Sequence, residues 1–190
     1  MPPFGYPHPS APSDTGSPRD GCFSFQNFSA RAFSIETQLQ EWICPDSPDS
    51  SLVSLAEAYR SAALIYLYRV LRHHIPAKLP ILNVKIARRV DAIVQHVSDM
   101  PIECLPECTM LFPLFLAGGE AASDHHTRYI RHRLAALAAF RRFRNVDVAL
   151  EVLEELWHRK ERAVRAEEAA DRMPDWLDIL KERGWKLPLS

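Results

Sequence analysis

The residues that come closest to a metal-binding pattern are two cysteines. Cys104 and Cys108 lie four residues apart, a spacing that would place both thiolates on one face of a helix and let them share a zinc ion. However, Pro106 lies between them, and the other cysteines, Cys22 and Cys44, form no second closely spaced pair. We therefore interpret Cys104 and Cys108 as small, partly buried thiols.

Three histidines, His125, His126 and His132, are the next candidates, either as metal ligands or as a general base. Adjacent side chains on a helix point in different directions, and no set of carboxylates is spaced to complete a first shell of ligands. These histidines therefore suit the start and the surface of a helix. We predict no metal-ligating residue and no cofactor.

Nucleophilic catalysis needs a nucleophile, a base and an orienting group, and the sequence lacks the Gly-x-Ser-x-Gly pattern that exposes a nucleophilic serine. Gly118 and Gly119 do not form a phosphate-binding loop either, because the acidic Glu120 follows them where a basic residue is needed. We therefore predict no catalytic residue and no enzymatic activity.

Arginines between positions 128 and 144 are the strongest candidates for binding nucleic acid. Arg128, Arg131 and Arg142 would lie together on one helix face, where they could neutralise phosphates. The aromatic residues of this helix lie on its apolar side, however, and acidic residues are abundant nearby, so we favour a solvated helix face. The formal net charge of −1 also gives no long-range attraction to nucleic acid or to an anionic membrane.

The length of 190 residues suits one domain whose core needs no disulfide or metal. Because the chain shows no secretory leader, its four cysteines indicate reduced thiols and an intracellular location. The apolar run from Ala62 to Tyr68 is bounded by Arg60 and Arg69 and is far shorter than the roughly 20 residues of a membrane span. We expect no membrane insertion.

Hydrophobic periodicity predicts helices separated by short turns, and no polar–apolar alternation is long enough for a strand. The fold class is therefore all-α, a multi-helix domain with an orthogonal or bundle-like arrangement. Residues 1–30 contain six prolines, and we expect them to form a disordered tail. We expect Ser50 or Ser51 to cap the second helix and Gly184 to end the last one. The expected helices cover, approximately, residues 33–43, 52–73, 84–100, 106–122, 125–144, 146–165 and 175–183.

Two of these helices carry informative apolar patterns. The run from Ala62 to Tyr68 is apolar on nearly every face, which predicts a central helix that other helices surround. In the following helix, valines and an alanine at three- and four-residue spacing predict one buried stripe. This stripe consists of Val84, Ala87, Val90, Val94 and Val97.

A further helix contains Pro113, Gly118 and Gly119 within an apolar stretch. In a helix interior a proline costs about 3 kcal/mol and each glycine about 1 kcal/mol relative to alanine, so tertiary packing must hold the segment in place. Either a kink and the small residues allow neighbouring backbones to approach closely, which we favour, or the kink shapes an apolar cavity for a small effector between helices.

Several segments, taken in order, have the residue patterns of one known family. They are Leu55 to Arg69, Phe112 to Ala121, Arg144–Asn145, Val152 to Trp157, and Asp175–Trp176. Together they resemble the C-terminal part of the fungal-specific transcription factor domain, the helical regulatory region of zinc binuclear cluster transcription factors. The resemblance extends from about Ile35 to Ser190, so we expect a helical regulatory domain over residues 31–190 after the tail of residues 1–30.

The resemblance implies a nuclear regulator of transcription by RNA polymerase II, whose helical region contacts partners or senses a metabolite. Family members normally begin with a six-cysteine module that holds two zinc ions and reads DNA, and four cysteines cannot build it. We therefore expect no direct DNA contact. The expected partners are other proteins or the N-terminal region that family members carry, and the chain is either a natural short protein or a truncated gene product.

A free-standing helical module that binds a small molecule is the alternative function. The two functions predict different amounts of exposed apolar surface on the protein. A fragment without upstream helices should leave a large apolar patch on Ala62 to Tyr68, whereas a self-sufficient binder should enclose that helix and keep an internal cavity. We expect the first outcome, so the run from Ala62 to Tyr68 should be incompletely covered.

Overall fold

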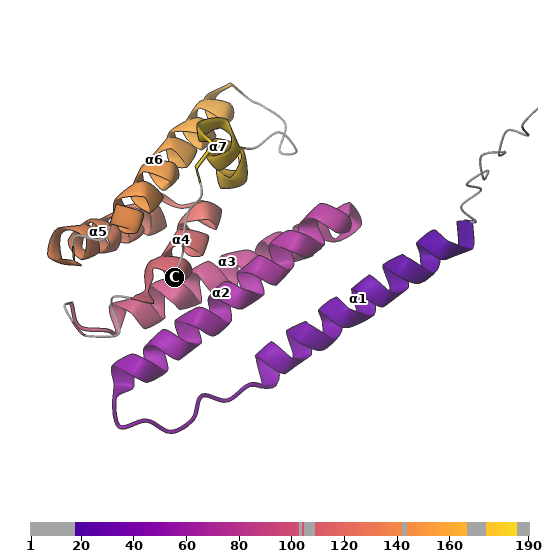
Figure 1. The fold of residues 1–190 in the computed structure, drawn as a ribbon, viewed down its shortest axis with the longest axis horizontal. Helices are drawn as coiled ribbons and strands as arrows, with labels where there is room; N and C mark the ends of the chain where they lie inside the picture. The colour runs from indigo at the N-terminus through magenta and orange to yellow at the C-terminus, as the bar shows by residue number, and fades with distance from the viewer. Residues whose placement is uncertain (1–17, 103, 105–108, 142–143, 167–173, 186–190) are drawn as a thin grey trace, which may run out of the picture.

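The computed structural model describes residues 18–102, 104, 109–141, 144–166 and 174–185 (Figure 1). This part of the chain consists of α-helices and one short 3-10 helix and contains no strand, which confirms the all-α prediction. The elements are α1 (Pro18–Glu41), α2 (Ser50–His74), η1 (Pro76–Lys78), α3 (Leu79–Ser98), α4 (Leu111–Glu120), α5 (Asp124–Arg141), α6 (Arg144–Arg165) and α7 (Trp176–Arg183).

Helix α4 lies at the centre of the fold. The long helices α2 and α3 form a hairpin on one side of it, and α5 and α6 form a second hairpin on the other side (Figure 1). Its apolar side chains contact both hairpins, and Leu114, Phe115 and Ala117 are completely buried. A ten-residue helix of this composition is stable here because neighbours cover it on every side.

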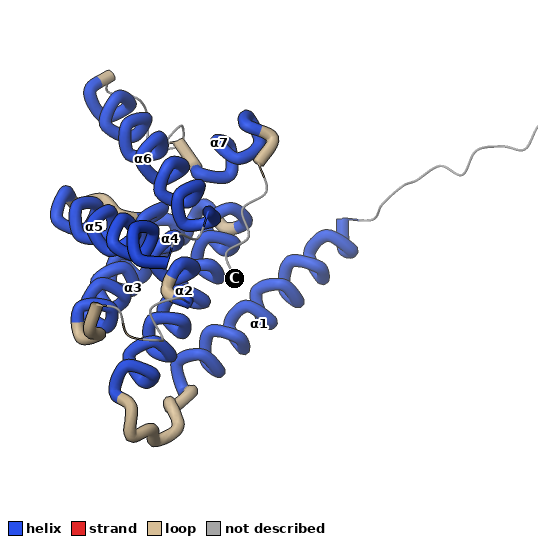
Figure 2. Tube along the Cα trace, turned by 60° about the vertical axis from the view of Figure 1, so that its left-hand side comes forward, coloured by secondary structure: helices blue, strands red, loops and turns tan. Residues whose placement is uncertain are grey.

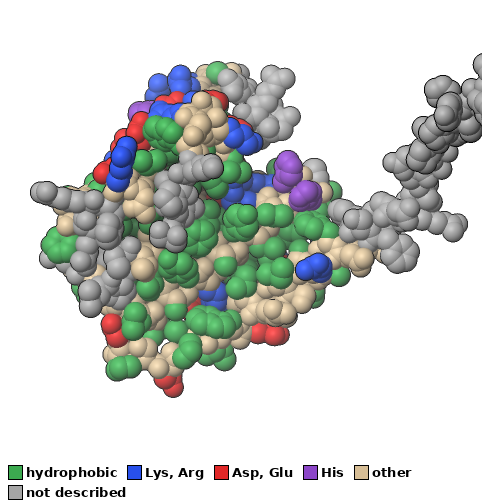
Figure 3. Space-filling model, viewed as in Figure 1, with side chains coloured by type: hydrophobic (Ala, Val, Ile, Leu, Met, Phe, Trp, Pro, Cys, Tyr) green, Lys and Arg blue, Asp and Glu red, His purple; other side chains and the backbone are tan. Residues whose placement is uncertain are grey.

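The expectation that the apolar run of α2 is incompletely covered is confirmed in part, because Tyr66 is exposed and Ala63 and Leu67 are half-buried. Ala62, Leu64 and Ile65 have no exposed surface, and the exposed residue of the run is Tyr66, at 55%. Helices α3 and α4 pack on two sides of α2, and α1 lies along a third side. Hydrophobic side chains are also visible on the face of the molecule shown in Figure 3. Other exposed apolar side chains are Phe33 on α1, Ile43 in the segment after α1, and Leu52 in α2.

Helix α1 begins at Pro18, earlier than the helix expected from about Phe33, while residues 1–17 lie outside the described part of the chain. The N-terminal half of α1 extends away from the other helices (Figure 2). The C-terminal half is fixed by Glu36, which accepts hydrogen bonds from the Tyr68 hydroxyl at 2.9 Å and from Lys85 Nζ at 2.5 Å. This contact joins α1 to both helices of the first hairpin.

The Glu36 contact also changes the acidity of its two buried members. Burial by itself raises the pKa of Glu36, but the hydrogen bonds from Lys85 and Tyr68 outweigh it, and the net pKa is lowered. Burial, followed by the hydrogen bond to Glu36, raises the pKa of Tyr68 to about 12. The ionised carboxylate and the neutral phenol are therefore the stable pair near neutral pH.

The start of α4 differs from the prediction. The helix begins at Leu111, so Pro113 lies in the first turn, where a backbone amide has no intrahelical acceptor and its loss costs little. The expected start at Pro106 lies outside the described residues, and the position of Pro113 requires no kink. The interpretation of a proline in a helix interior is therefore wrong.

Three details of the helix ends and faces complete the comparison with the sequence. The cap of α2 is Asp49, whose carboxylate accepts from the Ser51 amide at 2.8 Å, in place of the expected Ser50 or Ser51. Gly184 ends α7 in the left-handed conformation with φ of 64°, as predicted. The face that α3 buries is Leu82, Ile86, Val90, Ile93 and Val97, so Val84 and Ala87 are exposed.

Candidate functional site

The cysteines and histidines singled out in the sequence do not converge. In the described part of the chain, no three His, Cys, Asp or Glu side chains are arranged to hold a metal ion. Cys104 is a half-buried free thiol, and Cys108 lies outside the described residues. His126 Nε2 is 3.1 Å from Asp91 Oδ1, in a contact between α5 and α3, while His125 and His132 are exposed.

The arginines of α5 are engaged locally. Arg131 lies 3.3 Å from Glu154 and its guanidinium stacks over the Trp157 ring at 5.0 Å, so this side chain joins α5 to α6. Arg128 donates to the Asp124 carbonyl at 3.2 Å. Arg142 lies outside the described residues. Among the described helices, none is long and apolar enough to cross a membrane.

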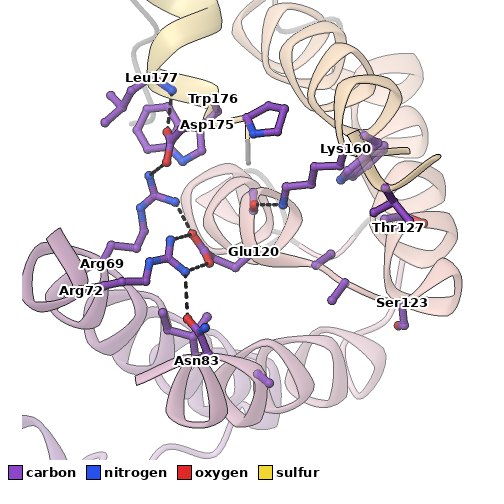
Figure 4. A pocket seen from close by; sticks show the side chains of 18 of the residues that line it. Arg69, Arg72, Asn83, Glu120, Ser123, Thr127, Lys160, Asp175, Trp176 and Leu177 are labelled. Carbon is purple, nitrogen blue, oxygen red and sulfur yellow. Dashed lines mark hydrogen bonds and ion pairs between the residues drawn. The ribbon is translucent and has the colours of Figure 1, made fainter. Parts of the chain in front are cut away.

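Charged residues from three distant segments meet at the end of α4. We call this cluster the arginine–carboxylate junction; its members are Arg69, Arg72, Glu120 and Asp175 (Figure 4). Arg72 donates to both Glu120 oxygens at 2.9 Å, and Arg69 pairs with Glu120 and with Asp175, the latter at 2.7 Å. The side chains of Arg69 and Glu120 are 10% and 8% exposed. The junction therefore ties α2, α4 and the start of α7 together through shielded, charge-assisted hydrogen bonds.

Trp176 extends the junction into the core. The guanidinium of Arg69 lies over the indole at 5.0 Å, and the Phe115 ring meets the indole edge-on with centroids 5.1 Å apart. Asp175 also accepts from the Leu177 amide at 2.8 Å and so caps α7. One short segment therefore supplies an ion pair, a buried aromatic ring and a helix cap.

The two glycines of α4 make this close approach possible. A Cβ atom on Gly119 would lie 2.9 Å from Trp176 Cδ1, and one on Gly118 would lie 2.8 Å from Leu153 Cδ1. Both distances are shorter than ordinary carbon–carbon contacts. The favoured interpretation of the glycine pair is therefore confirmed in part: neighbouring helices pack closely on both glycines, but the nearest atoms belong to the side chains of Leu153 and Trp176 and not to a backbone.

The last carbonyls of α4 receive side chains from α6. Trp157 Nε1 donates to the Gly118 carbonyl at 2.9 Å, and Lys160 Nζ donates to the Gly119 carbonyl at 2.7 Å. These carbonyls lie near the C-terminal end of the helix, where acceptors lack intrahelical donors and a positive charge is favourable. Helix α6 thus completes the end of α4.

An open cleft with a volume of about 1540 Å³ lies beside the junction. Its walls come from α2, α3, the segment 119–131, α6 and α7. Figure 3 shows basic and histidine side chains where the surface is hollowed between the α6–α7 part and the end of α2. Burial lowers the pKa of Lys160 in this cleft; the charges of Glu120 and Asp175 act in the opposite direction, and those of Arg69 and Arg72 lower it further.

The residues of the junction could not be identified from spacing. Arg69 is 51 residues from Glu120 and 106 residues from Asp175 in the sequence. The resemblance, however, includes all three positions, because they fall within Leu55 to Arg69, Phe112 to Ala121 and Asp175–Trp176. Segments that resemble one family are therefore brought into contact at one place.

The fold and the junction define a helical domain in which distant segments are joined by paired charges, beside a cleft that can receive another molecule. A model of the family described as fungal specific transcription factor domain matches residues 19–190, a span that includes all these segments. The chain therefore belongs to the fungal-specific transcription factor domain family, and its role lies in regulating transcription. Neither the curated proteins nor the solved structures gave a match.

Proposed function

We propose that the chain is the regulatory and interaction region of a zinc-cluster-type transcription factor that acts in the nucleus on transcription by RNA polymerase II. It works through contacts with proteins or with an N-terminal region of the family's architecture, and it does not bind DNA through a zinc module. The observation that carries this proposal is the family match over residues 19–190.

The arrangement of the charges supports a role in contact. The arginines and carboxylates of the junction are paired with one another, so they stabilise the positions of α2, α4 and α7. A ligand or partner that displaces α7 would have to break the pair between Arg69 and Asp175 and move Trp176 away from Phe115. The junction is therefore a place where binding on the surface can alter the core.

A reporter assay tests the proposal. The full chain is fused to a heterologous DNA-binding domain and expressed in fungal cells that carry the matching reporter gene. We expect reporter output to differ from that of the DNA-binding domain alone, and the fluorescently tagged chain without that domain to accumulate in the nucleus. A fusion that is present in the nucleus and leaves the reporter unchanged would contradict the regulatory role.

Two variants separate the effect of the junction from a general effect of charge. Glu120→Gln should reduce the effect on the reporter, because it weakens the bonds of Glu120 to both arginines. Glu161→Gln is the matched control, since Glu161 forms an exposed pair with Arg165 on the surface of α6. The purified chain should also leave the mobility of DNA fragments unchanged, and a shifted fragment would contradict the lack of DNA contact.

The alternative, a helical module that binds a small molecule, is a second candidate because of the cleft beside the junction. The two functions are compatible, since a domain that regulates transcription can respond to a ligand.

A further inference from the structure

We propose that the cleft beside the junction binds a small amphipathic carboxylate, whose anionic group meets Lys160 and whose apolar body lies along the exposed hydrophobic side chains of the cleft, Val164 among them. The regulatory meaning of this binding rests on the proposed function, but the binding itself can be measured independently of transcription.

The first argument is the balance of charge around Lys160. Arg69 and Arg72 are already paired with Glu120 and Asp175, so the junction has no net charge. Lys160 Nζ has the Gly119 carbonyl as its hydrogen-bond acceptor, and no carboxylate oxygen of the described residues lies within 4.0 Å of it. An ammonium group has three donors, so this one can still donate to an anion. Among the described cations that line the cleft, Lys160 and the exposed Arg128, which donates to the Asp124 carbonyl, are not paired with a carboxylate, and Lys160 is the half-buried one of the two.

The second argument is the surroundings of that charge. Lys160 is half-buried, and burial lowers its pKa because the charged form is poorly solvated there. A carboxylate in contact with Nζ would replace the missing solvation and favour the ammonium form. Figure 4 shows the Lys160 side chain reaching from α6 toward the end of α4, with Thr127 and Ser123 on the neighbouring wall.

The third argument is the apolar surface along the walls. Four large hydrophobic side chains that line the cleft are exposed, including Val164 at 67%. The others are Tyr66, Leu79 and Leu177. Binding sites for small molecules combine such apolar walls with a few placed polar groups. An apolar ligand body would remove this surface from water, which is favourable in proportion to the area covered.

The same features favour a carboxylate over other classes of ligand. A phosphate with two charges needs more than one free cation beside it. Arg69, Arg72 and Arg131 are already engaged with carboxylates, and Arg128 is exposed to solvent and donates to the Asp124 carbonyl. A cationic ligand would face the charge of Lys160. A single negative charge on an apolar body matches the half-buried ammonium of Lys160 beside hydrophobic walls.

Isothermal titration calorimetry of the full chain with three related probes tests the proposal. The probes are naphthylacetate, naphthylethanol and naphthylethylammonium, which share an aromatic body and differ in charge. We expect naphthylacetate to bind more tightly than the neutral alcohol and the ammonium to bind most weakly. Lys160→Met should weaken naphthylacetate binding by about tenfold or more, the usual effect of losing a hydrogen bond to a charged group, and should leave naphthylethanol unaffected. The control is the substitution Lys78→Met, which removes a lysine outside the cleft. This variant should bind all three probes as the wild type does.

A second pair of variants decides the matter if Lys160→Met fails to fold. Val164 is largely exposed, so Val164→Glu and Val164→Gln should both fold, and they differ from each other in charge. Val164→Glu should weaken naphthylacetate binding and strengthen naphthylethylammonium binding relative to Val164→Gln. The proposal is overturned if the wild type binds no naphthylacetate, if it binds the ammonium probe as tightly, or if the two Val164 variants do not differ. A silent reporter combined with tight naphthylacetate binding would contradict the proposed function and leave the ligand site intact.

Discussion

Replacing Glu120 by glutamine tests whether the junction holds the two halves of the domain together. Glu120 is 8% exposed and accepts hydrogen bonds from Arg69 and Arg72. Glutamine keeps the size of the side chain and one acceptor oxygen, but it removes the negative charge. In the variant, Arg69 would remain shielded from water with Asp175 as its carboxylate partner.

The expected loss of stability follows from these contacts. Removing one partner of a buried ion pair costs about 3 to 5 kcal/mol, because the other charge is left without compensation. Two features reduce this value here: Arg72 is 28% exposed and can turn to solvent, and Arg69 keeps its contact with Asp175. We therefore expect the free energy of unfolding to fall by about 2 to 3 kcal/mol in Glu120→Gln.

Urea denaturation followed by far-ultraviolet circular dichroism measures this loss. The control is Glu161→Gln, because Glu161 and Arg165 form an exposed pair with side chains 60% and 78% exposed. Such a pair contributes about 0.5 kcal/mol or less, so the control should unfold almost as the wild type does. If Glu120→Gln lost no more stability than Glu161→Gln, the junction would not stabilise the fold and the reasoning would be refuted.

Two further perturbations test other contacts of the core. Gly118→Leu should destabilise the protein by about 1 to 3 kcal/mol, because a side chain there overlaps Leu153; an unchanged melting temperature would show that the site is roomy. Glu36→Gln should lower stability above pH 4.5, the ordinary pKa of the carboxyl group, because the lowered pKa in the folded state favours folding when Glu36 is ionised. As the pH falls through that lowered pKa, the difference in free energy of unfolding between wild type and Glu36→Gln should shrink. If unfolding curves from pH 7 to pH 3 gave a constant difference, the assigned contact would be contradicted.

Features set by neighbours along the chain follow from the helical period of the sequence. The apolar arc of α5 is buried at Ile130, Leu134 and Leu137, because residues three and four apart lie on one side of a helix. The pair between Glu155 and Arg159 on α6 forms at 2.7 Å for the same reason. These features need only the helical period, which the sequence contains.

Features that depend on distant helices were predicted less well. In α3 two arcs both repeat at helical spacing, one through Val84 and Ala87 and the other through Leu82 and Ile86. Both arcs continue to Val90, so the period alone does not choose between them. The positions of α2 and α4 decide which arc is buried, and they select the one that contains Leu82. Similarly, the role of Pro113 depended on where α4 begins, which is the least certain property of a helix read from sequence.

The glycine pair shows how the junction depends on a local cost. Two glycines in a helix cost about 1 kcal/mol each relative to alanine, so local propensity opposes them. Because the two glycines carry no Cβ atom, the side chains of Leu153 and Trp176 can lie against the backbone of α4. Helices α6 and α7 therefore approach the end of α4. That approach puts the last carbonyls within reach of Trp157 and Lys160. The residues least favourable for the helix are therefore the ones that allow distant segments to meet at its end, and a substitution there should disturb the junction and the neighbouring cleft together.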